Sequence, residues 1–384
     1  MNLIFGMLLV LLAGVSTLFG KDAEIVVTPL DLPAKGKTGF QLLTPQSTGL
    51  SPKSEYVPLK NVPIRETGHS GLAVGDVNGD GLMDLYVCGM ETANALYINK
   101  GNWKFEDQTE SAGVACRGWR LNGAVFVDVD GDVDLDLVLT SLLDGRNFMY
   151  LNDGQGRFTE NREVGWVYNP RGGTVSSAFS DVDGDGDLDM YTTGFVKVFL
   201  NQELAMDYAL EIQKLGLIAV DKNRIPPEIF WEYYDIDEKS HIEGLFKSED
   251  AGPQMRPAYM EDQLYLNNGK GGFVAVSDRE RRFVDYQGRM MKRPRDPSHE
   301  ALFRDMDGDG DPDLYITADF AAPDRLWFND GRGYFRQAHP HSMRRTSQFS
   351  MGMDFTDVNR DGHIDFLTAD MLSRSHKRRK TQMG

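Results

Sequence analysis

The feature that most constrains this chain is a nine-residue segment, DVDGDGDLD, which begins at Asp181 and ends at Asp189. Aspartates occupy its odd-numbered positions, and glycines stand at positions 4 and 6. Carboxylates packed this closely repel one another unless a cation lies among them. Six to eight oxygen ligands in a flexible shell suit Ca2+, and glycine lets the backbone fold so that the side chains converge. The segment therefore predicts a calcium-binding loop.

The same pattern occurs five times. The other copies read DVNGDGLMD, DVDGDVDLD, DMDGDGDPD and DVNRDGHID, and they begin at residues 76, 128, 305 and 357. An acidic solvated turn has no reason to recur in register, so we predict up to five Ca2+ ions, one per loop. Ligands are expected from side chains at positions 1, 3, 5 and 9 and from the carbonyl at position 7. The predicted side-chain ligands are Asp76, Asn78, Asp80, Asp84, Asp128, Asp130, Asp132, Asp136, Asp181, Asp183, Asp185, Asp189, Asp305, Asp307, Asp309, Asp313, Asp357, Asn359, Asp361 and Asp365.

The loops are not EF-hands. An EF-hand carries a Glu at position 12 and lies between helices. Position 12 here is Val, Leu, Thr, Ile and Thr in the five copies. The flanks are short runs of apolar, β-branched and aromatic residues, such as residues 123–127 before the second loop and 314–316 after the fourth. Such runs are typical of strands, so we expect β-hairpins with a metal ion at each turn.

A second motif repeats with the loops. The loops start 52, 53, 124 and 52 residues apart. After each of the first four loops comes a short apolar and aromatic segment that ends in Asn, at residues 96–99, 149–152, 264–267 and 326–329, and a phenylalanine opens the next strand. A fixed period of this size indicates stacked supersecondary units. With about four short strands per unit, the sequence predicts an all-β fold, a β-propeller of four-stranded blades.

These motifs resemble the FG-GAP/VCBS repeat proteins, whose calcium-loop blades are similar to those of integrin α subunits. The nearest likeness is to the bacterial branch similar to cartilage acidic protein and UnbV. The resemblance covers roughly residues 40–384 and implies a Ca2+-binding propeller, usually seven-bladed, that acts in adhesion or recognition. Five loops fall short of seven blades, so an incomplete propeller is expected. Val133 replaces a loop glycine in the second copy and Arg360 one in the fifth, and weaker or distorted sites are expected there.

The N-terminal part of the chain has a separate character. Residues 1–20 are an apolar run that fits a secretory signal peptide or an uncleaved N-terminal anchor. Either alternative sends the remainder outside the cytoplasm, so we expect the protein to be secreted, periplasmic or at the cell surface. Residues 21–70 contain a strand-like piece at 40–44, which is expected to complete a blade and close the ring. Residues 71–384 hold the propeller repeats.

Two insertions interrupt the repeats. Residues 192–262 contain apolar residues at helical spacing between Glu203 and Asp221, so this insertion is expected to be mostly helical. It fits either a cap packed on the propeller or a lid that contacts a ligand. Residues 277–300 are rich in Arg and Lys and fit either a solvated loop or an anion-binding one. The only two cysteines, Cys88 and Cys116, fit either a disulfide or two buried thiols.

The net charge of the chain limits the classes of binding partner that fit the sequence. The formal net charge is −17, and the five loops alone contain 21 aspartates. A broad basic face is absent from the sequence pattern, which disfavours nucleic acid as a partner. We expect a non-catalytic recognition or adhesion module that binds protein or carbohydrate, and that contacts membrane only through the N-terminal segment if this is uncleaved. Two alternatives stay open. One is a propeller-fold lyase or hydrolase that uses Ca2+ structurally or electrostatically, and the other is a purely structural blade array.

Overall fold

The computed structural model describes residues 41–51, 71–89, 93–142, 146–162, 173–194, 234–236, 255–257, 261–291, 296–319, 322–339, 341–343, 346–347 and 350–370. Two compact units divide the chain, Met1–Leu43 and Thr44–Gly384, and the features below belong to the second. Residues 1–20 and the helix expected between 203 and 221 lie outside the described residues. Among the residues that are described, no helix is long and apolar enough to cross a membrane.

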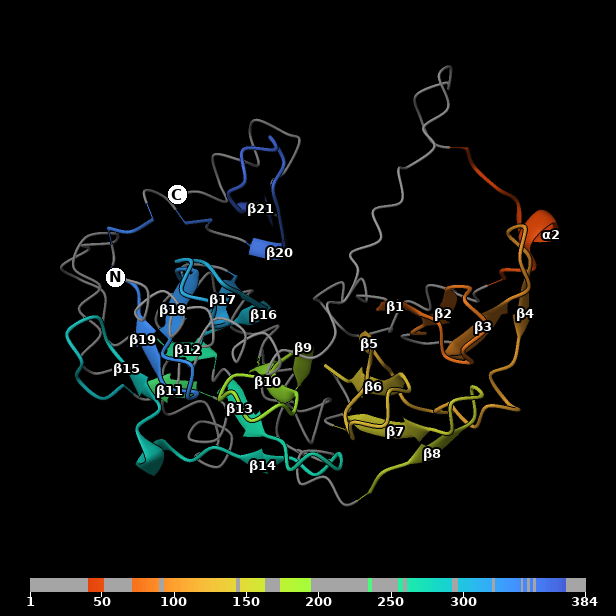
Figure 1. Ribbon diagram of the computed structural model, residues 1–384, viewed down its shortest axis with the longest axis horizontal. Coiled ribbons are helices and arrows are strands. Elements are labelled where there is room, and N and C mark those ends of the chain that lie inside the picture. Colours follow the sequence, from red (N-terminus) through yellow and green to blue (C-terminus); the bar gives the residue numbers. More distant parts are fainter. Residues whose placement is uncertain are drawn as a thin grey trace, which may run out of the picture. The chain divides into compact units, whose positions relative to one another are not determined.

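Antiparallel sheets follow one another along the chain (Figure 1), and we call them blades 1 to 5. Blade 1 contains β1 (Leu72–Gly75), β2 (Asp84–Val87), β3 (Ala95–Asn99) and β4 (Phe105–Asp107). Blade 2 contains β5 (Gly123–Val127), β6 (Asp136–Thr140), β7 (Phe148–Asn152) and β8 (Phe158–Glu160). Blade 3 contains β9 (Thr174–Ser180), β10 (Asp189–Gly194), β13 (Gln263–Leu266) and β14 (Val274–Ala275). Blade 4 contains β16 (Ser298–Arg304), β17 (Asp313–Ala318), β18 (Arg325–Asn329) and β19 (Phe335–Gln337), and blade 5 is the hairpin of β20 (Ser350–Thr356) and β21 (Asp365–Asp370).

Each aspartate loop joins the first two strands of its blade, as the sequence predicts. In blade 1, for example, Gly75 lies opposite Asp84, so the loop begins directly after β1 and ends on the first residue of β2. The fold is nearly all-β and propeller-like. Within the first insertion the structure describes a pair of strands, in which β11 (Tyr234–Ile236) pairs with β12 (Met255–Pro257). At the N-terminus, the short helix α2 (Pro45–Thr48) follows Leu43 and Thr44, and residues 41–51 contain no strand.

The second insertion is more ordered than a solvated loop. A short 3-10 helix, Asp278–Glu280, is followed by β15 (Phe283–Val284). β15 pairs in parallel with β19, with Phe283 opposite Phe335, and adds a fifth strand to blade 4. The ring of Phe283 lies 5.1 Å from that of Phe335 and 5.2 Å from that of Trp327. The composition of this insertion predicts a charged segment, and it does not predict the two-residue apolar strand.

Apolar clusters join successive blades. Tyr86 of blade 1 shares one cluster with Leu137 and Phe148 of blade 2. Further clusters join blade 2 to blade 3, blade 3 to blade 4, and blade 4 to the blade 5 hairpin. A blade is a single sheet and cannot bury both of its faces alone, so each blade depends on its neighbours, as in other repeat folds. The aspartate loops are therefore attached to a scaffold whose stability is shared between blades.

Both cysteines are free thiols in the cluster between blades 1 and 2. The Cys116 Sγ lies 3.1 Å from the Tyr150 hydroxyl. Burial raises the pKa of Cys88 to about 12 and that of Cys116 to about 11. Because thiolate is the reactive form, both groups are poor nucleophiles at neutral pH. Of the two alternatives that the sequence left open, the structure shows free thiols, with Cys88 buried and Cys116 half-buried.

A buried polar residue stands five positions before the last Asn of the third strand in blades 1 to 4. It is Asn94 in blade 1, Asn147 in blade 2, Asp262 in blade 3 and Asp324 in blade 4. In each blade its Oδ1 accepts a backbone N–H at the end of the second strand or within two residues after it. The two aspartates also accept hydroxyl groups from tyrosine and from the first strand of the next blade, as Asp262 does from Tyr191 (3.2 Å) and Ser298 (2.9 Å).

Replacing Asp262 with Asn is expected to change how stability depends on pH. Burial raises the pKa of Asp262 to about 7, against the partly offsetting hydrogen bonds from Gly194 and Ser298, whereas an unfolded Asp titrates near about 3.9. In the folded state the protonated form of Asp262 is therefore favoured. Its contribution to the free energy of unfolding falls as pH rises from about 4 to about 7. Across this pH range the free energy of unfolding of Asp262→Asn should rise, relative to that of the wild type, by on the order of a few kcal/mol.

Urea unfolding at a series of pH values measures this difference. Asn147→Asp in blade 2 is the matched control, because it places a carboxylate at the equivalent position and should add the same pH dependence. Parallel pH profiles for the wild type and Asp262→Asn would contradict a neutral, buried Asp262.

Candidate metal centre

The loops fold through two residues in the left-handed region of backbone space. Positions 4 and 6 have positive φ in all five copies. In the third loop these are Gly184 (φ 75°) and Gly186 (φ 97°). The Asp181 carboxylate then accepts three backbone N–H groups, from Gly184 at 2.8 Å, Asp185 at 3.1 Å and Gly186 at 3.0 Å. These contacts wrap the backbone around the first aspartate, so that later side chains turn back toward it.

The second and fifth loops adopt this backbone without one of the glycines. Val133 has φ 79° at position 6, and Arg360 has φ 62° at position 4. A non-glycine residue in this region places its Cβ close to the following carbonyl oxygen, which costs about 1–2 kcal/mol. The backbone of these two loops therefore keeps the conformation of the others, and the substitutions produce local strain at Val133 and Arg360.

Val133→Gly is expected to stabilise the protein by about 1 kcal/mol, because glycine adopts a positive φ without this penalty. The Val133 side chain is 87% exposed, so its removal loses little packing. The expected gain is net of the larger unfolded-state entropy of glycine. Urea unfolding in EGTA measures it without a contribution from metal. Val133→Ala is the control, since it removes the β-branch and retains the strained φ, and it should gain less. A less stable Val133→Gly would contradict the strain.

Position 9 has a structural role that spacing alone did not indicate. The side chain of Asp189 is buried, and its Oδ2 accepts the N–H of Val182 (3.1 Å) while its Oδ1 accepts that of Asn267 (2.9 Å). The same pair of bonds, from loop position 2 and from the last residue of the third strand, holds Asp84, Asp136 and Asp313. Asp365 makes the first of them, from Val358. Position 9 therefore fastens the loop to the third strand as well as facing the site.

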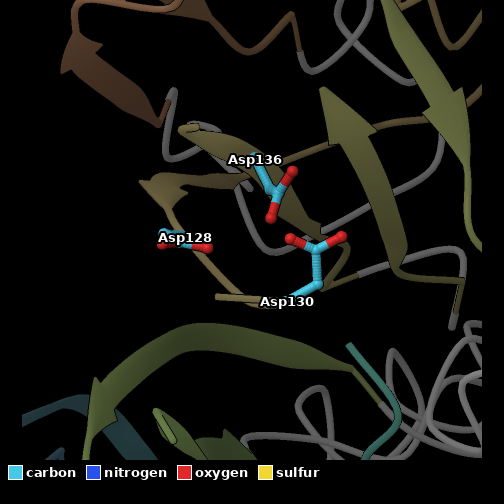
Figure 2. Close-up of side chains that lie close together, drawn as sticks. All are labelled: Asp128, Asp130 and Asp136. Atoms are coloured by element: carbon cyan, nitrogen blue, oxygen red, sulfur yellow. The ribbon is translucent and has the colours of Figure 1, made fainter. Parts of the chain in front are cut away.

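Carboxylates from positions 1, 3 and 9 come together in three loops. In the second loop, oxygen atoms of Asp128, Asp130 and Asp136 lie within 4.8 Å of one another, and Figure 2 shows the three side chains around a common centre. Equivalent triads form in the third loop, with Asp181, Asp183 and Asp189, and in the fourth, with Asp305, Asp307 and Asp313. Loops 1 and 5 have an amide at position 3, so each has one carboxylate fewer.

Two oxygens in these triads are buried without a hydrogen-bond partner. They are Oδ1 of Asp130 and Oδ1 of Asp183, both at position 3. A buried carboxylate oxygen that accepts no hydrogen bond is costly, and a cation satisfies it. Hard oxygen donors of this kind are those that Ca2+ takes. The residues at positions 1, 3 and 9 therefore fit a calcium ion.

Burial shifts the acid–base behaviour of the triads. It raises the pKa of Asp136 and Asp189 to about 7 and that of Asp313 to about 6, and backbone hydrogen bonds offset part of the rise. Neighbouring carboxylates in the same loops raise these pKa values further. The ionised triad is thus unfavourable by itself, which is the condition under which a divalent cation binds with most effect.

The position-5 residues neighbour the position-3 carboxylates without belonging to the triads, and Asp185 is among the groups that raise the pKa of Asp183. Asp185 Oδ1 accepts the N–H of Asp187 two residues on, at 3.0 Å. The position-5 carboxylates of the other four loops accept in the same way. These aspartates close a local turn beside the triad, and the structure does not bring them into it. Their predicted role as ligands stays a prediction.

Asparagines of the repeated strand motif connect each of the first three loops to the following blade. Asn152 at the end of β7 donates its Nδ2 to Val77 O in the first loop (2.8 Å) and to Leu135 O in its own loop (3.1 Å). Asn267 bridges Val129 O and Leu188 O in the same way. Asn329 donates to Val182 O at 2.9 Å. The sequence showed these residues as the end of a repeated strand motif, and only the structure shows that they join adjacent blades.

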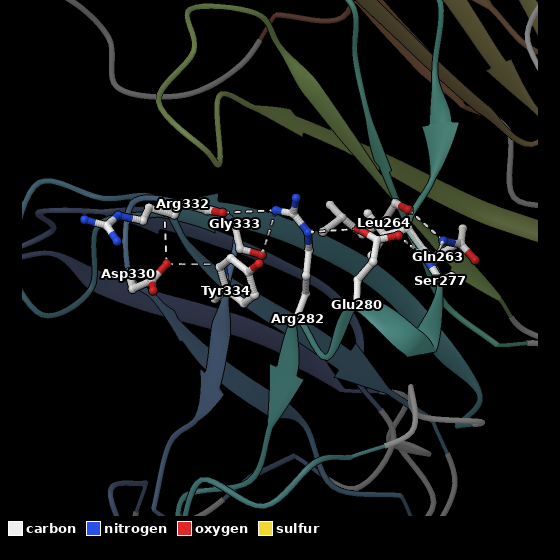
Figure 3. A network of polar contacts seen from close by, with 10 residues as sticks. Gln263, Leu264, Ser277, Glu280, Arg282, Asp330, Arg332, Gly333 and Tyr334 are labelled. Atoms are coloured by element: carbon white, nitrogen blue, oxygen red, sulfur yellow. Dashed lines mark hydrogen bonds and ion pairs between the residues drawn. The ribbon is translucent and has the colours of Figure 1, made fainter.

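The second insertion reaches the third loop through Arg282 (Figure 3). Its Nη1 donates to the carbonyls of Arg332 (3.0 Å) and Gly333 (3.4 Å), and its guanidinium lies 5.0 Å from the centre of the Tyr334 ring. Burial and the neighbouring Asp185 raise the pKa of Asp183, and the charge of Arg282 acts in the opposite direction. One basic residue of this insertion therefore supports the turn that packs on the third loop.

Comparison with known families accounts for this repeated unit. The family described as FG-GAP-like repeat matches residues 76–139, 128–192 and 305–368. Each match begins on the first aspartate of a loop, and together the three ranges contain all five loops. The chain carries FG-GAP-like repeats. Each matched range runs from the aspartate loop of one blade to the second strand of the next blade.

Similarity to solved structures is weak. The repeats resemble an Agrocybe aegerita lectin that recognises non-reducing terminal N-acetylglucosamine (18% identity, TM-score 0.29, 70% of this chain and 65% of that one). They also resemble the Photorhabdus luminescens Tc holotoxin pore (15%, 0.31, 78% and 10%) and the V. cholerae biofilm matrix protein Bap1 (14%, 0.29, 75% and 41%). The chain thus spans less than two thirds of each of these proteins. No curated protein sequence matches it.

Proposed function

We propose that the protein is a calcium-binding, extracellular recognition module in which FG-GAP-like repeats present a non-catalytic binding surface. The observation that carries the calcium assignment is the pair of buried, unpartnered oxygens on Asp130 and Asp183 inside carboxylate triads. Protein and carbohydrate are the partner classes proposed. Nucleic acid is disfavoured by the net charge of −17.

Calcium would act mainly on the scaffold. Each triad lies at a hairpin turn, and in the second and third loops the position-2 carbonyl of the same loop accepts a hydrogen bond from the following blade. An ion that neutralises the triad therefore supports both the turn and the contact between blades. One site at a hundredfold excess of Ca2+ over its dissociation constant stabilises the folded state by about 2.7 kcal/mol. Millimolar Ca2+ outside cells supports the extracellular setting.

Isothermal titration of the full chain with Ca2+, at pH 7.5 and with Mg2+ for comparison, tests the assignment. Asp130→Ala should remove one binding event and leave the others. Asp134→Ala in the same loop is the control, because position 7 is expected to bind through its backbone carbonyl, which the substitution retains. Equal Ca2+ stoichiometry for Asp130→Ala and the wild type would exclude the second loop as a site.

The recognition role needs its own readout. Immobilised glycans and extracellular-matrix proteins would be probed with the full chain in Ca2+ and in EGTA. The proposal expects binding that is lost in EGTA. Ca2+ binding without any Ca2+-dependent partner in either class would leave the metal assignment intact and argue against the recognition role.

A further inference from the structure

The turn that packs on the third aspartate loop is held by Arg282, a residue of the second insertion. Its Nη1 donates to the carbonyls of Arg332 and Gly333, and its guanidinium lies over the Tyr334 ring (Figure 3). The Arg282 side chain is only 14% exposed. Its positive charge is therefore screened less by solvent and salt than the charge of an exposed arginine.

Gly333 places this charge beside position 3 of the third loop. An added Cβ at Gly333 would lie 2.5 Å from the Arg282 Nη1 and 3.5 Å from the Cβ of Asp183. These two distances limit the separation of that nitrogen from the Asp183 Cβ to about 6 Å. Asp183 carries one of the two buried triad oxygens that have no hydrogen-bond partner. A fixed positive charge thus lies close to a carboxylate that we assign to the metal.

The second loop has an equivalent support without the charge. Its sequence contains the same five aspartates as that of the third loop and differs from it only at position 6. The turn that packs on it contains Gly271, whose carbonyl accepts the Asn161 amide at 3.2 Å. An added Cβ at Gly271 would lie 3.4 Å from the same amide nitrogen. A neutral side chain therefore holds this turn, and support of the turn does not require an arginine.

We propose that Arg282 sets the Ca2+ affinity of the third loop, because its charge stabilises the empty carboxylate triad and opposes the binding of a cation. This inference rests on the proposed function, since it requires that Ca2+ binds in the loop. Glu280 acts in the opposite direction, because its Oε2 lies 3.4 Å from the Arg282 Nε and offsets part of the charge. The second insertion thus shifts filling of the third site to a higher Ca2+ concentration.

Isothermal titration of the full chain with Ca2+ at low ionic strength tests the proposal on three variants. Arg282→Gln should raise the affinity of one binding event roughly tenfold, the size of effect that a nearby unit charge has on a divalent ion. Arg282→Lys should bind Ca2+ as the wild type does, because it keeps the charge. Glu280→Gln should lower the affinity, because Arg282 then acts unopposed, and it retains an acceptor for the Ser277 N–H.

Two further measurements separate charge from structural support. Both Arg282 variants weaken the hold on the turn, and urea unfolding in EGTA measures that loss without metal. The gain of Arg282→Gln should also be larger for La3+, about thirtyfold, because the interaction with a unit charge scales with the charge of the ion. In an Asp183→Ala background, Arg282→Gln should leave the remaining binding events unchanged, which assigns the effect to the third loop.

Three results would overturn the inference alone: equal Ca2+ affinity for Arg282→Gln and the wild type, an equal gain for Arg282→Gln and Arg282→Lys, or a gain that persists in the Asp183→Ala background. In each of these cases Ca2+ still binds to the wild type, and the proposed function stands. A wild type that binds no Ca2+ would overturn the proposed function and this inference with it.

Discussion

Asp189→Ala is expected to destabilise the folded protein by roughly 3–5 kcal/mol in the absence of metal, because two buried backbone N–H groups lose their acceptor and each costs about 1–3 kcal/mol unpaired. These groups belong to Val182 and Asn267, at 3.1 and 2.9 Å from the carboxylate. The side chain is 1% exposed, so water does not replace it. Urea unfolding in EGTA measures the loss separately from any effect of Ca2+.

Asp187→Ala is the matched control in the same loop. It also removes one negative charge, and in the described residues no hydrogen bond ends on its carboxylate, so the expected change is below about 1 kcal/mol. Similar losses for the two variants would show that removal of charge, and not the lost acceptor, determines the effect. In that case position 9 would have no structural role beyond metal binding.

Asn267→Ala is expected to lower the free energy of unfolding by about 2–4 kcal/mol, because three hydrogen bonds of a buried amide are lost together. Its Nδ2 bonds Val129 O in the second loop (2.8 Å) and Leu188 O in the third (3.0 Å), and its Oδ1 accepts Asn268 N (2.8 Å). Two carbonyls are left buried at the contact between blades. Unfolding followed by circular dichroism and by intrinsic fluorescence gives the loss.

Asn99→Ala offers the internal comparison. Asn99 makes the bonds to its own loop and turn but none to another loop among the described residues. Its loss should therefore be smaller, about 1 kcal/mol. If Asn99→Ala and Asn267→Ala cost the same, the bond to the adjacent loop adds nothing, and the tie between blades that the structure shows has no energetic weight.

The sequence predicted what is local. Aspartates at alternate positions with glycines between them specify one loop, and the apolar runs on either side specify the two strands that it joins. The hairpins therefore appear where the spacing placed them, from Asp76–Asp84 to Asp357–Asp365. Each triad could also be anticipated at positions 1 and 3, since neighbouring odd positions of a wrapped loop face one centre. For position 5 the same spacing predicts a ligand, which stays a prediction, and the structure adds that this side chain closes a turn.

What the sequence did not reveal depends on contacts between distant residues. The Asn267 amide bonds a carbonyl 138 residues earlier, and that of Asn329 one 147 residues earlier. No single-repeat pattern contains such a pair, although the recurrence of Asn at the same place in four repeats was a usable signal. β15 was missed for another reason: two apolar residues among arginines leave no period to detect, and the strand exists because Phe283 finds Phe335 and Trp327 to pack against.

The most direct test of the central claim, that the aspartate loops hold Ca2+, is a thermal melt of the full chain in Ca2+, in Mg2+ and in EGTA. The account predicts a midpoint that is several degrees higher in Ca2+ than in EGTA, that rises further with Ca2+ concentration by mass action, and that Mg2+ does not reproduce. Identical midpoints in Ca2+ and EGTA for a folded sample would contradict it, because the triads would then be stable without the ion that their chemistry fits.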